Sequence, residues 1–73
     1  MSVHLHREID ELKKRILGLS ALVEESLYKA VKAVEARDEK LAREVIEGDQ
    51  QLDMVEVEVE EECLKILALH QPV

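Results

Sequence analysis

Two long lines of apolar residues, each stepping by three or four positions, constrain this chain more than any other feature. The first line contains Leu5, Ile9, Leu12, Ile16, Leu19, Val23, Leu27, Ala30 and Val34, and the second contains Leu41, Val45, Gly48, Leu52, Val55, Val59, Cys63, Ile66 and Leu69. This spacing places side chains on one side of an α-helix, so it predicts two amphipathic helices, at about residues 3–36 and 39–70. We therefore expect an all-α fold.

The break between the two lines is only the short segment Ala36-Arg37-Asp38. Asp38 is a favourable N-cap for the second helix, and Pro72 is expected to end that helix. A connection this short makes the helices antiparallel neighbours, so the prediction is an antiparallel two-helix hairpin. The stretch Val55–Glu60 alternates apolar and acidic residues, which leaves a strand as the alternative at this place.

The turn position also predicts a register between the helices. With the turn at Arg37, the basic run Lys13–Arg15 lies opposite the acidic run Glu60–Glu62. We expect ion pairs between the two runs, although surface pairs of this kind contribute only about 0.5 kcal/mol each.

Further apolar residues lie off the two main lines, at Leu17, Leu22, Val31, Ile46, Leu64 and Leu67. The apolar arc is therefore wider than a seam between two helices requires. We expect a third helix, a second copy of the chain or another partner to cover the remainder. A homodimer or higher homo-oligomer that closes a four-helix bundle is the simplest solution.

The charge of the chain is strongly asymmetric. The formal net charge is −7, and all of it lies in residues 39–73, which carry ten acidic and three basic side chains. Such a surface repels phosphate groups, so neither nucleic acid nor an anionic membrane is an expected partner. The expected partners are instead cations and basic protein surfaces.

The location expected from the sequence is cytoplasmic. Cys63 is the sole cysteine, so no internal disulfide is possible. The first ten residues lack the apolar run of a signal peptide. No stretch approaches the ~18 apolar residues of a membrane-spanning helix, so we expect no direct membrane insertion.

Asp49, Asp53, Glu56 and Glu60 form an acidic line at helical spacing on the second helix. Several carboxylates on one side of a helix suit a hard cation, and a solvated acidic face is the alternative explanation. The sequence contains neither a nucleophile and base at motif spacing nor a Gly-rich loop. We therefore expect no enzymatic activity.

Several short blocks carry a family resemblance: Val23-Glu24 with Leu27 and Ala30-Val31, Asp38 with Leu41-Ala42, Val45-Ile46-Glu47-Gly48-Asp49, Leu52-Asp53 with Glu56, Glu60–Leu64 and Ala68–Val73. Together they resemble the first two helices of one three-helix repeat of the PhoU family, which regulates phosphate uptake in bacteria and archaea. The sequence departs from the family at Ser20-Ala21, where Gly-Gly is usual. The family's third helix, with its second acidic motif ERxxD, lies outside the sequence, which predicts an incomplete PhoU-like domain over residues 1–73.

The resemblance implies a regulator that couples a phosphate ABC transporter ATPase to a sensor histidine kinase. It also implies multinuclear metal binding through D/E-xxx-D motifs, which Asp49 and Asp53 match. Asp49, Asp53 and Glu56 are therefore the candidate ligands for a divalent or multinuclear metal, such as Fe, Zn, Mn or Mg. The leading hypothesis is a PhoU-like regulator that acts by protein contact. A metal-binding helical bundle and a purely structural oligomerisation hairpin are the alternatives.

Overall fold

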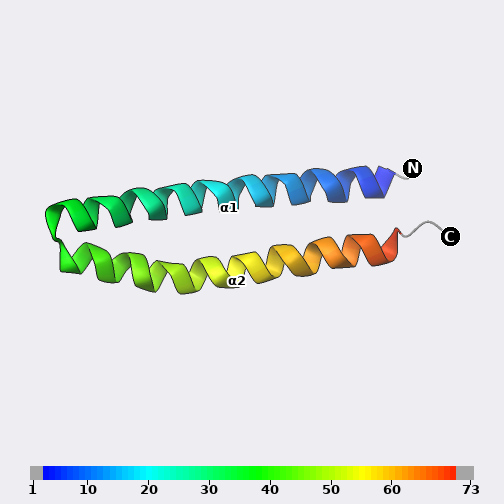
Figure 1. The fold of residues 1–73 in the computed structure, drawn as a ribbon. Coiled ribbons are helices and arrows are strands. Elements are labelled where there is room, and N and C mark those ends of the chain that lie inside the picture. Colours follow the sequence, from blue (N-terminus) through cyan, green and yellow to red (C-terminus); the bar gives the residue numbers. More distant parts are fainter. Residues whose placement is uncertain (1–2, 71–73) are drawn as a thin grey trace.

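The computed structural model describes residues 3–70, which form two helices. Helix α1 is Val3–Ala36 and helix α2 is Glu39–Leu69. The helices run antiparallel and side by side, so both ends of the chain lie at the same end of a rod (Figure 1). The principal extents are 55 × 16 × 13 Å. The predicted all-α, antiparallel two-helix hairpin is confirmed.

The turn combines the end of one helix with the start of the next. Arg37 has φ 53, in the left-handed region, and its N–H donates to the Val34 carbonyl at 3.3 Å. The Asp38 N–H donates to the Ala33 carbonyl at 2.9 Å, which completes a Schellman motif at the end of α1. Asp38 then caps α2, because its Oδ1 accepts from the Leu41 N–H at 3.0 Å. A connection of two residues therefore provides hydrogen-bond partners for backbone groups at the end of α1 and at the start of α2.

The far end of α2 closes with a backbone hydrogen bond from the His70 N–H to the Ile66 carbonyl, at 3.1 Å. The prediction that Pro72 ends this helix falls on residues outside the described part of the chain.

The seam between the helices is narrow. Among residues 3–70, the buried hydrophobic residues are Ala33, Val59 and Ile66. Leu27 and Val34 of the first predicted line are 62% and 78% exposed, and Leu69 of the second is 63% exposed, so their assignment to the seam was wrong. Ile16 of the first line is 41% exposed and lies at the edge of the seam. From Val23 onward, the side chains of α1 that face α2 are instead Ser26, Ala30 and Ala33, which follow one another at steps of three and four residues. Leu27 and Val34 lie one position further round the helix.

The alternating stretch within α2 is helical, which excludes the strand alternative. Val55 and Val59, four residues apart, are half-buried and buried, whereas Val57 is 51% exposed. This pattern is the period of a helix rather than that of a strand.

The predicted register correctly places the basic run of α1 beside an acidic part of α2, but the predicted ion-pair partners were wrong. The ion pair that crosses between the helices here joins the Arg15 guanidinium to Glu58, at 3.7 Å, and not to Glu60–Glu62. Lys14 instead pairs within α1, with Glu11, at 3.8 Å. Helical spacing places Glu58 on the same side of the hairpin as Arg15, whereas Glu60 lies on the other side.

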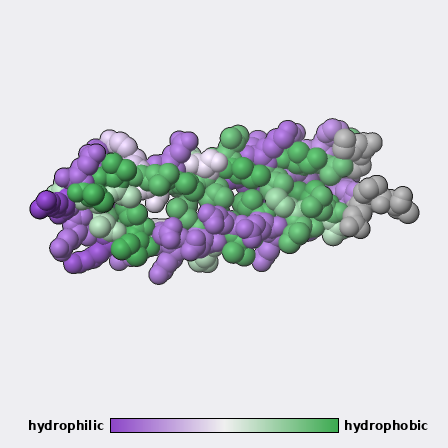
Figure 2. Space-filling view, in the orientation of Figure 1, coloured by the Kyte–Doolittle hydropathy of each residue, from purple (hydrophilic) through white to green (hydrophobic). Residues whose placement is uncertain are grey.

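The accessible surface of the chain is large for its mass. It is 6250 Å², whereas a compact monomer of 8.4 kDa exposes about 4,600 Å². Large hydrophobic residues such as Leu17, Val34 and Ile46 are exposed. Figure 2 shows hydrophobic residues in a band along one face, bordered by hydrophilic ones. Closure of a four-helix bundle by a second copy stays a prediction.

Candidate functional site

The acidic stripe, defined as Asp49, Asp53, Glu56 and Glu60, lies on the solvent side of α2. All four side chains belong to exposed residues. In the described part of the chain, the carboxylates in ion pairs are other ones, such as Glu25 with Lys29 at 3.2 Å and Glu39 with Arg43 at 3.7 Å. The four charges of the stripe are therefore uncompensated by the hairpin itself.

Apolar residues extend the stripe at both ends with the same 3–4 spacing. We define the α2 outer stripe as Ile46, the acidic stripe, Cys63 and Leu67. Ile46 is 66% exposed and Leu67 is 65% exposed. They lie three heptads apart, so they share one side of the helix. The outer stripe is consequently apolar, acidic and apolar in order along one face.

Each apolar end of this stripe borders a groove between the two helices. The turn-end groove has a volume of about 400 Å³ and is lined largely by aliphatic side chains, Ala30, Ala33, Val34, Ala42, Val45 and Ile46. The terminal-end groove has a volume of about 410 Å³ and is lined by Leu5, Ile9, Leu12, Cys63, Ile66, Leu67 and His70. Since Ile46 and Leu67 share one side of α2, the two grooves open on the same face of the hairpin.

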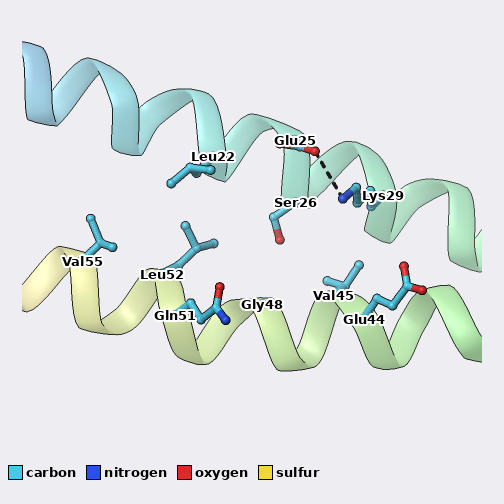
Figure 3. Close-up of a pocket in the computed structure, with 10 residues that line it drawn as sticks. All are labelled: Leu22, Glu25, Ser26, Lys29, Glu44, Val45, Gly48, Gln51, Leu52 and Val55. Carbon is cyan, nitrogen blue, oxygen red and sulfur yellow. Dashed lines mark ion pairs between the residues drawn. The ribbon is translucent and has the colours of Figure 1, made fainter.

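A third hollow lies on the opposite face, near the middle of the rod. Leu22, Leu52 and Val55 project into the space between the helices, and Ser26 points from α1 toward α2 (Figure 3). Glu25 and Lys29 pair with each other at its border. Gly48 contributes no side chain, and a Cβ built there would meet no heavy atom within 4 Å. The two helices therefore do not approach each other closely at Gly48.

The predicted metal ligands Asp49, Asp53 and Glu56 are neighbours on the acidic stripe. Within residues 3–70, no group of three or more His, Cys, Asp or Glu side chains is arranged to hold a metal ion. A hard cation prefers about six to eight oxygen ligands, so these residues would need donors from another molecule or segment. The metal site and the metal's identity stay predictions.

Sequence reasoning missed one contact near the chain ends. The His70 imidazole Nε2 lies 2.8 Å from the Glu8 carboxylate, in a part-buried hydrogen bond that joins the two helices. Only the antiparallel register brings these residues together, so a scan for local motifs could not find the pair.

No helix among the described residues is both long enough and apolar enough to span a membrane. The fold thus defines an all-α helical hairpin with one mixed apolar and acidic face. No solved structure matches the chain.

Comparison with known sequences identifies the family. Residues 16–73 match the PhoU domain. Among relatives, the chain is 38% identical to the phosphate-specific transport system accessory protein PhoU homolog of Aquifex aeolicus, over 93% of the chain and 31% of that protein. It is 33% identical to the accessory protein PhoU of Escherichia coli K12, over 99% of the chain and 30% of that protein. It is 38% identical to the phosphate-specific transport system accessory protein PhoU homolog 1 of Thermotoga maritima, over 97% of the chain and 31% of that protein.

The chain belongs to the PhoU family. It spans less than a third of the length of the curated relatives it matches.

Proposed function

We propose that this chain is a non-enzymatic regulatory segment of phosphate transport that acts in the cytoplasm by protein contact. The observation that carries the proposal is the PhoU domain match over residues 16–73. Relatives with 33–38% identity are named accessory proteins of phosphate-specific transport systems. The expected partners are the ATPase of a phosphate ABC transporter and a sensor histidine kinase.

The shape of the hairpin supports a contact role. Two grooves between the helices have largely apolar linings, and the hairpin also has exposed hydrophobic residues and an uncompensated acidic stripe. Exposed apolar patches bordered by polar residues mark interaction sites in proteins. The charge of −7 favours partners with basic surfaces.

The test is a pull-down with the immobilised chain from lysates of phosphate-replete and phosphate-starved cells, read by mass spectrometry. We expect the transporter ATPase or the sensor kinase to be enriched over beads that carry an unrelated acidic helical hairpin. Recovery of neither protein under either condition would contradict the proposal.

Metal binding is tested separately, because the acidic residues could serve either role. Elemental analysis of protein purified without chelator is compared for the wild type and the Asp49→Asn/Asp53→Asn variant. Bound metal that is lost in the variant would support the predicted site. Absence of Fe, Zn, Mn and Mg from the wild type would contradict the predicted metal site.

A further inference from the structure

We propose that Glu8 and His70 form a proton-sensitive clasp at the open end of the hairpin, closed when the His70 imidazole is protonated and weakened when it is neutral. The open end is the one where α1 begins and α2 ends (Figure 1). The inference concerns the conformation of the chain itself. It goes beyond the proposed function, because it needs no transport partner.

The first observation is the geometry of the pair. The His70 imidazole Nε2 lies 2.8 Å from the Glu8 carboxylate, and the two side chains are 24% and 35% exposed. A second ion pair across the hairpin, between Arg15 and Glu58, is longer, at 3.7 Å, and its side chains are 46% and 58% exposed. A shorter pair that is better shielded from water interacts more strongly, so the Glu8–His70 pair is the stronger of these two links between the helices.

The second observation is the place of His70 in α2. His70 is the C-cap of this helix, and its N–H donates to the Ile66 carbonyl at 3.1 Å. The last carbonyl groups of a helix carry partial negative charge, which favours a cation beside them. The last turn of α2, as the structure describes it, contains no basic residue that could fill this role. Protonation of one imidazole therefore improves two interactions, with Glu8 and with the end of α2.

Titratable and charged groups near the pair come from both helices. On α1, His4 and Glu11 lie one turn to either side of Glu8, and Glu11 already pairs with a lysine of α1. On α2, Cys63 shares the terminal-end groove with His70. The other side chains that line this groove are aliphatic. Of these groups, Glu8 is the one hydrogen-bonded to the His70 imidazole.

The direction of the pH dependence follows from these contacts. An isolated histidine side chain has a pKa of about 6.5 and an isolated glutamate about 4.3, so both partners carry charge between these values. A hydrogen bond from an imidazolium to a carboxylate is roughly twice as strong as one between neutral groups. The stabilisation is therefore largest at about pH 5.5 and is reduced as the pH rises through the range in which histidine loses its proton. It is also lost in stronger acid, where Glu8 becomes protonated.

The clasp acts on the last turn of α2. Ile66, Leu67 and His70 form the α2 wall of the terminal-end groove, and residues of α1 form the other wall. A closed clasp holds these two walls together. A weakened clasp lets the last turn of α2 separate from α1, so the shape of the terminal-end groove depends on pH.

The experiment is a double-mutant cycle on the complete chain, with E8Q, H70Q and E8Q/H70Q compared with the wild type. Urea unfolding is followed by circular dichroism at about pH 5.5 and about pH 8.5, on either side of the ordinary histidine range, in EDTA to exclude bound metal. We expect the coupling between the two residues to change the unfolding constant about fivefold at the lower pH and about twofold or less at the higher pH.

Two further variants serve as controls. His6 is an exposed histidine of the first turn of α1, two positions from Glu8, so the two side chains point away from each other. The H6Q and E8Q substitutions should therefore show no coupling at either pH. H70K keeps a positive charge at both pH values, so its coupling to Glu8 should be the same at both.

Hydrogen exchange measured by mass spectrometry reports the clasp locally. At about pH 5.5, E8Q should exchange about fivefold faster than the wild type in the last turn of α2, and equally fast around Gly48 in the middle of that helix. At about pH 8.5 the two proteins should differ by about twofold or less. This comparison is made at one pH at a time, so the intrinsic pH dependence of exchange cancels.

Equal coupling between Glu8 and His70 at the two pH values would overturn the proposal, because the pair would then be an ordinary hydrogen bond that does not sense protons. Coupling of H6Q to E8Q as strong as that of H70Q would assign the effect to the general charge of the chain. Exchange that accelerates uniformly along α2 in E8Q would show global destabilisation instead of a local clasp.

Discussion

Replacement of Gly48 by Ala should stabilise the hairpin. Gly48 lies in the interior of α2, where glycine is about 1 kcal/mol less favourable than alanine. The added Cβ would meet no heavy atom within 4 Å, so no clash opposes the gain. The net expectation is a free energy of unfolding raised by about 1 kcal/mol, which is about 4–8 °C in Tm for a domain of this size.

The measurement is thermal and urea unfolding followed by circular dichroism at 222 nm. Gly18→Ala is the matched control, because Gly18 lies in the interior of α1 and its Cβ is also unobstructed. Each variant should gain a similar amount, and the double variant should gain about 2 kcal/mol, since distant sites add. A loss of stability in Gly48→Ala alone would refute the reasoning. It would mean that another segment or molecule fills the hollow beside Gly48.

Three further substitutions test the turn and the seam, each by the same unfolding measurement. Asp38→Ala removes the cap on the Leu41 N–H and should cost about 1 kcal/mol, whereas Asp38→Asn should retain most of the stability. Arg37→Gly should raise stability by up to about 1 kcal/mol, because glycine is preferred at the left-handed position that ends α1, and a loss would refute the Schellman assignment. Ile66 is 7% exposed, so Ile66→Ala should lower the free energy of unfolding by about 2–4 kcal/mol. Leu67 is 65% exposed, so Leu67→Ala should lower it by less than about 0.5 kcal/mol. Similar losses for the two variants would show that the seam is misplaced.

Local sequence was sufficient to predict the helices, their order and the turn. The 3–4 spacing of apolar residues and the cap at Asp38 are short-range signals, and both helices begin and end within a residue of the predicted positions. The left-handed conformation of Arg37 was not predicted, because arginine rarely adopts it and only the six-residue hydrogen-bonded turn requires it.

Which apolar residues pack in the seam depended on the second helix. Leu27 and Val34 are more hydrophobic than Ser26 and Ala33, so composition favours them for the core, yet they remain exposed. Two helices can bury only one narrow stripe each, and small residues at that stripe allow close packing near the turn. The pairs Arg15–Glu58 and Glu8–His70 likewise follow from the register, which places side chains far apart in the sequence within reach of one another. Helical periodicity therefore sufficed for the secondary structure, while the packing of α1 against α2 selected the buried stripe and left an apolar and acidic face uncovered.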